Sequence, residues 1–454
     1  MADANTAQEW KHKEKIIFRF VFIFFLLQVI PLDWKYYQRV FDVQLSQLHY
    51  SDFFNIARYT PQFTGGRAAN ALSWGLSTWK DWVLIALLST AGTIIWSTRD
   101  KRATAYNNLY YLLRVLLRYR LAIAVIAYGF IKLFPMQQPY PSLSLLNTNY
   151  GDLSDWKIAS LSYGVAPSFE SFLGAVEVLA GVLLFFRKTA SVGAAIVTGF
   201  VGNVLLSNLA YGGGEAWYCL YLLSIAAVLV WYDAPRWQQV ITQGQPAYPN
   251  RYRPLFYTGL VKNARFIFKT AFVLVFALYG VAAYVLFLDG AYQYPQGAGL
   301  EKAAGLYNVS EFRINGKTIP YSLTDAVRWQ NVVFEKWNTV SIATSNLVKP
   351  DLQHTEEIFA ADENRNYEAT GSSGRWFYRY TIDPARHVLA LRNRNVHYAA
   401  DVLELSYSRP DNEHIILTGI NAHKDSIYVQ LDRLKKIYLL NESVEIPRHR
   451  TGFE

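Results

Sequence analysis

Two patterns of hydrophobic positions divide the chain near residue 289. Before this point, apolar residues form long runs separated by short polar or basic stretches. After it, short segments rich in β-branched and aromatic residues alternate with polar positions and turn signals. A run of about 20 apolar residues has the length of a membrane-spanning helix, whereas alternation is typical of a strand with one buried face. The chain is therefore predicted to combine an α-helical transmembrane bundle with an all-β domain.

The long runs predict about seven membrane-spanning helices. These lie at about residues 15–32, 80–97, 120–135, 167–186, 189–210, 215–232 and 265–288. Residues 35–80 are mixed and aromatic and contain no run of spanning length, so we expect an extramembrane loop there. A second loop is predicted at 136–167, and a polar linker at 233–263.

The alternating segments of the last part of the chain predict a small β-domain from about residue 290 to residue 454. Its strand-like segments are TVSIATS, RWFYRYTI, HVLALRN, DVLELSY, HIILTGI and SIYVQLDR. They are separated by turn signals and follow one another every ten to twelve residues or so, which is typical of short antiparallel strands. We therefore expect an antiparallel meander that is closed, or nearly closed, into a barrel.

Basic residues beside the apolar runs predict the orientation of the chain. They form four groups on alternate loops: Lys11, Lys13 and Lys15; Arg99, Lys101 and Arg102; Arg187 and Lys188; and Arg236, Arg251, Arg253, Lys262 and Arg265. Loops on the cytoplasmic side of a membrane carry an excess of lysine and arginine. Seven spans with a cytoplasmic amino terminus satisfy this rule, and they leave the β-domain outside the cytoplasm.

Composition supports the membrane class and excludes several others. Hydrophobic residues make up 52% of the chain and charged residues 17%, which is well under the usual quarter. The formal charge of +9 lies beside apolar runs and not in a separate tail, so we expect no nucleic-acid partner. The single cysteine, Cys219, excludes an intrachain disulfide.

No motif in the chain predicts a metal or nucleotide site. The eight histidines form no H-x-x-H or H-E-x-x-H spacing. His387, His397, His414 and His423 fall on separate predicted strands or turns, where solvent-facing side chains are more common than a metal site built across strands. A glycine-rich phosphate loop and a G-x-S-x-G motif are also absent from the sequence, so no metal site is predicted.

The first candidate for chemistry is Lys132, near the end of the apolar run RLAIAVIAYGFIKLFP. Two interpretations are open. Its ammonium group could extend along the helix to the membrane interface. It could instead point into the bundle, where removal from water makes a lysine a usable base or nucleophile.

Glu170 and Glu177 are the acidic candidates on the next span. With Gly174 and Gly181 they share one face of a helix, and glycines at this spacing let a second helix approach closely. The glutamates would then face protein and not lipid. An ionisable group at depth in a membrane is a hypothesis of function by default. Glu177, the deeper of the two, either pairs with a cation of a neighbouring helix, handles protons, or does both.

Polar and aromatic residues nearby are candidates for binding a cofactor. Asn203 and Asn208 lie on the fifth predicted span, where hydrogen bonds between helices are the commoner role and a ligand contact is the alternative. Tyr128 lies one turn before Lys132 and is equally consistent with a core aromatic residue and with a group that stacks on a quinone.

Several stretches of the chain resemble the DoxX-like family of bacterial membrane proteins. They are RYRLAIAVIAYGFIKLFPMQQPYP, GDLSDWK, SFESFLGAVEVLAGVLLFFRKTASVGA and NVLLSNLAY. The resemblance covers about residues 118–237, and ILTGINAHKDSIYVQLDR is similar to the last strands of long members with a carboxyl-terminal β-domain. It implies a four-helix core in a bacterial inner membrane, a periplasmic β-domain, and membership of a quinone-linked oxidoreductase complex. Long members often carry an acidic residue and a lysine where this chain has YGGGEAWY.

A more distant likeness is to the membrane domain of vitamin K-dependent γ-carboxylases. The pattern Y-G-F-I-K, which ends at Lys132, is similar to a helix there whose lysine acts as a base in quinol-coupled chemistry. This resemblance extends to Lys132 alone.

These observations predict four regions and leave two functions open. The regions are a two-span part (1–106), a DoxX-like four-helix core (107–237), a linker with the seventh span (238–289) and the β-domain (290–454). The chain is either a quinone-linked oxidoreductase subunit, with Lys132, Glu177 and Glu170 at its site, or a non-catalytic inner-membrane subunit or assembly factor. In the second case the β-domain would bind a protein or an apolar ligand, and other membrane or periplasmic subunits would be partners.

Overall fold

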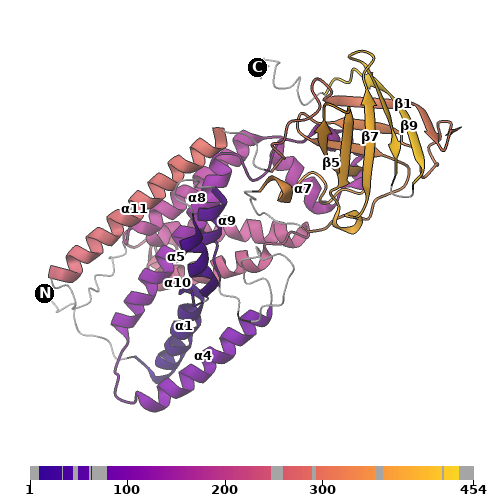
Figure 1. Ribbon diagram of the computed structural model, residues 1–454. Coiled ribbons are helices and arrows are strands. Elements are labelled where there is room, and N and C mark those ends of the chain that lie inside the picture. Colours follow the sequence, from indigo (N-terminus) through magenta and orange to yellow (C-terminus); the bar gives the residue numbers. More distant parts are fainter. Residues whose placement is uncertain are drawn as a thin grey trace. The chain divides into compact units, whose positions relative to one another are not determined.

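A computed structural model describes residues 10–32, 34–43, 50–60, 63, 79–246, 259–288, 293–353, 361–421 and 424–438. The chain forms two compact units (Figure 1). The helical unit comprises Met1–Pro135 and Glu170–Gly290, and the barrel unit comprises Met136–Phe169 and Ala291–Glu454. The segment 136–169 therefore lies within the sequence of the predicted four-helix core but belongs to the barrel unit. His423 lies outside the described residues.

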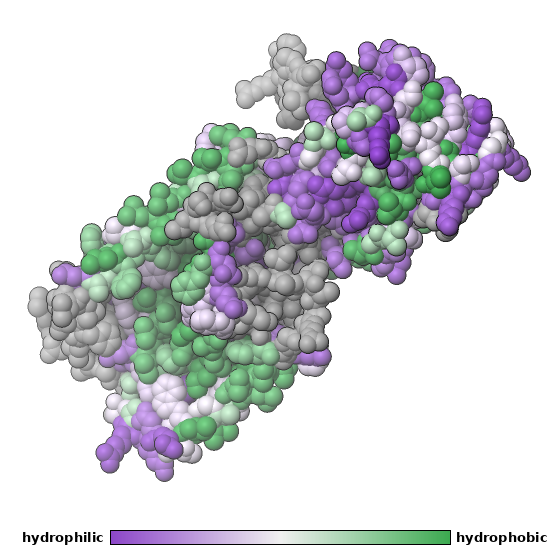
Figure 2. Space-filling view, in the orientation of Figure 1, coloured by the Kyte–Doolittle hydropathy of each residue, from purple (hydrophilic) through white to green (hydrophobic). Residues whose placement is uncertain are grey.

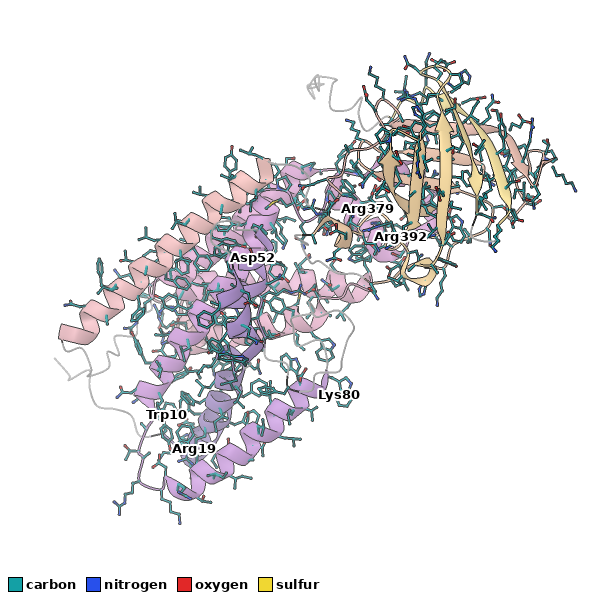
Figure 3. The ribbon with its side chains drawn as sticks, viewed as in Figure 1. Trp10, Arg19, Asp52, Lys80, Arg379 and Arg392 are labelled. Atoms are coloured by element: carbon teal, nitrogen blue, oxygen red, sulfur yellow. The ribbon has the colours of Figure 1, made fainter. Side chains whose placement is uncertain are left out.

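The helical unit is built from the long apolar runs. Its described helices are α1 (His12–Val29), α2 (Trp34–Asp42), α3 (Tyr50–Ala57), α4 (Trp79–Arg99), α5 (Asn107–Leu133), α8 (Pro167–Phe185), α9 (Ala190–Ala210), α10 (Ala216–Ile241) and α11 (Gly259–Leu288). A helix pairs its own backbone N–H and C=O groups, so it is the form in which such a run can lie in lipid. Arg19 of α1, labelled in Figure 3, donates to Ser97 Oγ at 2.8 Å and links α1 to α4.

Five of the described helices are long and apolar enough to cross a membrane: α4, α8, α9, α10 and residues Phe266–Leu288 of α11. The surface of the helical unit is accordingly hydrophobic over wide areas (Figure 2). Phe268 and Leu278 of α11, for example, are 76% and 68% exposed. The chain is thus a multi-pass membrane protein. The two other predicted spans are helices α1 and α5, which contain more charged residues, and the count of seven stays a prediction.

Helix α5 is the most enclosed helix of this unit. From Leu121 to Gly129 all its residues but one are buried, and it ends at Leu133 because Phe134 precedes Pro135 and takes an extended conformation. Helix α3, in the region predicted as an extramembrane loop, packs against α5. Its Tyr50 is 1% exposed and donates to the carbonyl oxygen of Ala127 at 2.8 Å.

Helix α10 is longer than predicted. We expected it to end near Tyr232 and to give way to a polar linker, but it continues through Pro235 to Ile241. Proline removes one backbone hydrogen bond from a helix and usually ends or kinks it. Here side-chain contacts stabilise the extra turns, because Trp237 Nε1 donates to Ser191 Oγ of α9 at 2.8 Å and Arg236 pairs with Asp233 at 2.7 Å.

The barrel unit confirms the predicted antiparallel barrel. The strands are β1 (Gly305–Ile314), β2 (Lys317–Thr318), β3 (Asn331–Phe334), β4 (Thr339–Ala343), β5 (Trp376–Asp383), β6 (Val388–Asn393), β7 (Val402–Ser408), β8 (His414–Ile420) and β9 (Ser426–Leu434). In this described part of the chain, β1 and β3–β9 follow one another in an antiparallel order, and β1 also pairs with β9. Eight strands therefore close the barrel, and β2 extends β1 as a hairpin.

The barrel core follows from the alternation of the strands. Every second residue of β6, β7, β8 and β9 is buried along most of the strand. Tyr307, Phe312, Phe334, Leu405 and Val429 fill the interior with side chains at most 1% exposed. Strand β1 reaches both neighbours because it is ten residues long and is bent by an irregularity between Val309 and Glu311.

The predicted loop at 136–167 is instead an ordered part of the barrel unit. It contains the short helices α6 (Leu143–Leu146) and α7 (Asp155–Gly164). Leu145 and Trp156 pack in a second apolar cluster with Tyr294, Tyr367 and Phe377. Both helices begin at a serine whose hydroxyl accepts a hydrogen bond from the first turn, which is the usual N-cap.

Candidate functional site

The helical unit contains a buried ion pair between Lys132 of α5 and Glu177 of α8. Lys132 Nζ lies 2.8 Å from Glu177 Oε1, and the two side chains are 12% and 5% exposed. Lys132 therefore points into the helical unit, and its use as a base or nucleophile stays a prediction. The second carboxylate oxygen of Glu177 is buried and has no hydrogen-bond partner among the described residues.

Glycines bring α5 and α8 together at this pair. A Cβ atom placed on Gly174 would lie 2.1 Å from Leu133 N and 2.6 Å from the carbonyl oxygen of Gly129. A Cβ on Gly129 would lie 2.9 Å from the backbone nitrogen of Val178. The backbones are thus closer than any larger residue allows, as predicted from Gly174 and Gly181, which lie seven residues apart on one face of α8. The predicted buried stripe of Glu170, Gly174, Glu177 and Gly181 is confirmed.

A second buried ion pair joins Arg58, the residue after α3, to Glu215, the residue before α10. Their side chains are 9% and 8% exposed. Tyr128 of α5 connects the two pairs. Its hydroxyl lies 3.4 Å from Glu215 Oε2, and Lys132 Nζ lies 5.7 Å from the centre of its ring. The order of groups is therefore Glu177, Lys132, Tyr128, Glu215 and Arg58, which we call the ionic chain.

Asn208 positions Glu215. Its Oδ1 accepts a hydrogen bond from Glu215 N at 3.0 Å, and its Nδ2 donates to the carbonyl oxygen of Val204 at 2.9 Å. The turn between α9 and α10 folds tightly over this amide, because Gly212 has a φ of +67° and a Cβ on Gly213 would lie 2.3 Å from Asn208 Oδ1. Gly212 and Gly213 of the sequence YGGGEAWY are thus favoured by the turn that carries Glu215.

Arg58 is held in place by its own neighbours. Arg120 of α5 donates to the carbonyl oxygens of Ala57, at 2.6 Å, and of Tyr59. These bonds fix the chain on both sides of Arg58. The guanidinium of Arg58 lies 5.7 Å from the ring centre of Tyr218, whose ring in turn lies 5.7 Å from that of Tyr128. A cation near an aromatic face is attracted by the ring quadrupole, so both pairs have aromatic walls.

The predicted site residues differ in how they relate to the ionic chain. Lys132, Glu177 and Tyr128 belong to it directly. Asn208 touches it through Glu215. Glu170 is 2% exposed on the same stripe of α8 as Glu177. Asn203 is exposed on α9, and no described contact connects it to the ionic chain.

Two residues of the ionic chain were not predicted. Arg58 lies in the region expected to be a loop, and its partner Glu215 is 157 residues away. Glu215 falls in YGGGEAWY, which marks a departure from the DoxX-like pattern. A usable signal was present, since a glutamate directly before an apolar run sits at the start of a predicted helix, close to lipid, where it needs a partner.

The arrangement can hold and move protons. A charge is expensive to bury in an apolar bundle unless it is paired and hydrogen-bonded, and each charge here has an opposite neighbour. Moving a proton from Lys132 to Glu177 would leave two neutral groups still in contact, so a proton can shift without leaving an isolated charge. The Tyr128 hydroxyl can donate and accept a proton beside Glu215, and its ring lies near Lys132.

The barrel unit contains a separate buried polar cluster that attaches α6 and α7. Glu335 accepts hydrogen bonds from Ser144 N at 2.6 Å and from Ser144 Oγ at 2.7 Å. Trp337 Nε1 donates to Glu368 at 2.9 Å. Lys157 of α7 is completely buried and donates to the carbonyl oxygen of Tyr367.

Burial changes the acidity of these groups. Removal from water lowers the pKa of Lys157 to about 7, partly offset by the nearby Glu368. Burial and the adjacent Glu335 raise the pKa of Glu368 to about 8. The pKa of Glu335 is raised by burial as well, against the hydrogen bonds from Ser144. These side chains are enclosed and their contacts join segments of the unit, so their role is structural.

No group of three or more His, Cys, Asp or Glu side chains in the described ranges is arranged to hold a metal ion.

Comparison with known proteins gives one short similarity. The chain is 30% identical over 86 residues to a Bacillus subtilis protein described as uncharacterized protein YwoB. The matched segment covers 19% of this chain and 56% of that protein. The chain thus spans just over half the length of this relative. No family model matches the chain. No solved structure matches it either.

Proposed function

We propose that this chain is a DoxX-like integral membrane protein of the bacterial inner membrane that handles protons for a quinone-linked oxidoreduction. The observation that carries the proposal is the ionic chain, in which Tyr128 lies between two buried ion pairs, with its hydroxyl at Glu215 and its ring near Lys132. Ionisable residues are rare among membrane-spanning helices because they are costly there, and where they occur they commonly mark proton or substrate paths. A pair that only joined two helices would not need a tyrosine leading to a second pair.

The donor set fits a quinone. Lys132 and Tyr128 offer an ammonium and a hydroxyl as hydrogen-bond donors, and quinone carbonyl oxygens accept such bonds. Phe200 lies 5.2 Å from Lys132 Nζ and Tyr218 lies beside Tyr128, so aromatic faces are available for stacking. A bound quinone would supply a two-electron, two-proton couple. In this proposal the electrons come from a redox-active partner subunit, and this chain supplies the protons.

The residues of the ionic chain have distinct tasks in this scheme. Lys132 holds a proton at Nζ and orients the group that receives it. Glu177 pairs with the ammonium of Lys132 through Oε1. It can take the proton back at Oε2, which has no hydrogen-bond partner among the described residues. Tyr128 relays a proton between Lys132 and Glu215 through its hydroxyl. Arg58 pairs with Glu215 and holds it in position, because an arginine remains charged under all ordinary conditions.

Quinone binding tests the proposal directly. The full chain is purified in mild detergent, and binding of a short-chain quinone is followed by quenching of tryptophan fluorescence. We expect Lys132→Gln to weaken binding by about tenfold, which corresponds to about 1.4 kcal/mol, the order of one charge-assisted hydrogen bond. Lys269→Gln is the matched control, because this lysine contacts Phe186 and lies outside the ionic chain.

Two results would contradict the proposal. The wild-type chain could fail to bind quinone at micromolar concentrations, or Lys132→Gln could bind as well as Lys269→Gln. Circular dichroism and size-exclusion chromatography are used to check that both variants remain folded. Orientation is tested separately by reporter fusions at Arg187 and at the carboxyl terminus, which we expect on the cytoplasmic and the periplasmic side.

One observation favours the alternative, a non-catalytic subunit whose barrel binds a protein. Two linked loops expose apolar side chains, since Tyr321, Leu323, Val327 and Leu347 are 55–70% exposed. Ser345 Oγ donates to the carbonyl oxygen of Asp325 and joins the loops. A partner that copurifies with the wild type and is lost in Leu323→Asp, but not in Leu434→Asp at the other end of the barrel, would support this reading.

A further inference from the structure

Helices α5, α10 and α11 pack around the turn between α8 and α9 in the helical unit, and each of them carries a basic side chain near it. The basic residues come from α5, the α8–α9 turn, α10 and α11, and they are Arg114, Arg187, Lys188, Arg236 and Lys269. We call this group the basic cluster. It is separate from the ionic chain and has no part in the proposed chemistry.

Three of these cations lie close to aromatic rings of neighbouring elements. The guanidinium of Arg114 lies 3.1 Å from the ring centre of Tyr232 on α10. That of Arg187 lies 5.8 Å from the ring of Tyr111 on α5, and Lys269 Nζ lies 4.0 Å from the ring of Phe186. Each contact joins two different elements, since Arg187 and Phe186 lie in the α8–α9 turn and their partners lie on α5 and α11. The cluster is therefore a property of the fold and not of one basic stretch.

The segments that contribute the basic cluster contain few acidic residues. The segments that contribute to it, 107–120, 184–195, 228–246 and 259–275, contain a single acidic residue, Asp233, which pairs with Arg236. The Nε atom of Arg114 is buried and lacks a hydrogen-bond partner in the described part of the chain. Arginine donates a planar fork of N–H groups that suits phosphate, and like charges held together favour binding of an anion.

Exposed apolar surface continues directly from the basic cluster. Phe266, Ile267 and Phe268, which precede Lys269 on α11, are 63–76% exposed, and Phe186 is 46% exposed. Beneath them, the rings of Phe185 and Phe272 pack edge to face at 5.1 Å. A ligand that fits this surface carries a negative group for the cations and long apolar chains for the exposed helix face. A free anion would bind the cations but would leave the exposed helix face uncovered.

We propose that the basic cluster binds the phosphodiester headgroup of an anionic phospholipid, with the acyl chains lying along α11. Basic pockets between membrane helices bind such headgroups in general. The phosphate would lie at Arg114 and Arg187, which pack on rings of α10 and α5, and the lipid's chains would cover the apolar residues before Lys269. The site depends on the fold of the helical unit alone and does not require that the proposed quinone function is correct.

Lipid retention measured by native mass spectrometry tests this site. The full chain is transferred from detergent with equal amounts of phosphatidylglycerol and phosphatidylcholine of the same acyl chains. We expect about tenfold more phosphatidylglycerol to be retained, and no displacement by millimolar inorganic phosphate. The double variant R114Q/R187Q should retain both lipids equally.

The matched control is R99Q/R102Q, which removes the same charge from exposed positions at the end of α4 and in the following loop. It should leave the preference unchanged. Because R114Q/R187Q disturbs ring contacts within the bundle, K188Q/K269Q serves as a second variant and should reduce the preference by at least threefold. Equal retention of the two lipids by the wild type, equal loss in the control, or displacement by inorganic phosphate would each overturn the proposal.

Discussion

The close approach of α5 and α8 at Gly174 gives the sharpest test of the structure. In Gly174→Ala the new methyl group would meet Leu133 N at 2.1 Å, Lys132 C at 2.6 Å and Gly129 O at 2.6 Å. All three are backbone atoms, so no side chain can turn away. Ordinary contact begins at about 3.4 Å, and the helices must therefore separate by roughly 1 Å.

A shift of this size reaches the ionic chain. The Lys132–Glu177 contact of 2.8 Å would lengthen beyond the range of a hydrogen bond. Overpacking of a tight interface costs about 1–3 kcal/mol, and weakening of a buried pair adds to it. For a unit of this size 1 kcal/mol changes the melting temperature by about 2–4 °C, so we expect a fall of about 2–12 °C.

The assay is thermal unfolding of the purified full chain in detergent, followed by the loss of the monodisperse size-exclusion peak. Gly199→Ala and Gly202→Ala on α9 are matched controls, since a Cβ at either position meets nothing within 4 Å. Alanine favours the helix over glycine by about 0.5–1 kcal/mol, so the controls should be unchanged or slightly more stable. If Gly174→Ala melts with the controls, the inferred backbone contact is wrong.

Three further predictions concern the buried polar groups. Arg58→Ala or Glu215→Ala alone should cost about 3–5 kcal/mol in chemical unfolding, because each leaves a buried charge, while the double variant should cost less than the sum. Ser144→Ala should destabilise the barrel unit by about 1–3 kcal/mol, measured by denaturant titration, since buried Glu335 loses a donor. The stability of the barrel strands, measured by hydrogen exchange, should fall from about pH 4.5 to 8, because Glu368 has a raised pKa in the folded protein and holds its proton more tightly there than in the unfolded chain. It should rise from about pH 7 to 10.5, because Lys157 has a lowered pKa and is neutral in the folded protein while still protonated in the unfolded chain.

Each of these has its own control. Additive costs in the Arg58 and Glu215 variants would show that the pair does not interact. Ser406→Ala, at an exposed position of strand β7, should have little effect beside Ser144→Ala. Glu368→Gln should abolish the fall of stability below pH 8, and Lys157→Met should abolish the rise above pH 7. Identical pH profiles for the wild type and both variants would contradict the shifted pKa values of Glu368 and Lys157.

Much of the fold follows from local patterns. The apolar runs predict the helices because a chain in lipid must pair its backbone within each run. Strands β4 to β9 were predicted because each is short, rich in β-branched and aromatic residues and bounded by turn signals. The stripe of Gly174, Glu177 and Gly181 was also predictable, because its spacing of three to four residues identifies one face of a helix.

The remaining features depend on contacts between distant residues. Arg58 meets Glu215 across 157 positions, and nothing in the surroundings of either residue specifies the other. Strand β1 was not among the predicted segments, and its pairing with β9 joins Leu306 to Leu434. The segment 136–169 reads as a loop because its short helices are stabilised by the barrel unit and not by their own periodicity. Local patterns predict elements, whereas partners across the sequence require the structure.

The discontinuous barrel unit has a consequence for synthesis. Ser144 and its acceptor Glu335 are separated by 191 positions, and β1 can close on β9 only when nearly the whole chain has been made. At about 5–20 residues per second, α6 and α7 wait on the order of 10–40 s for the residues that bury them. Meanwhile α8, α9, α10 and α11 are produced. The buried lysine and tryptophan of α7 are therefore exposed throughout this interval, so the nascent chain, and not the finished protein, is the form that most needs a chaperone.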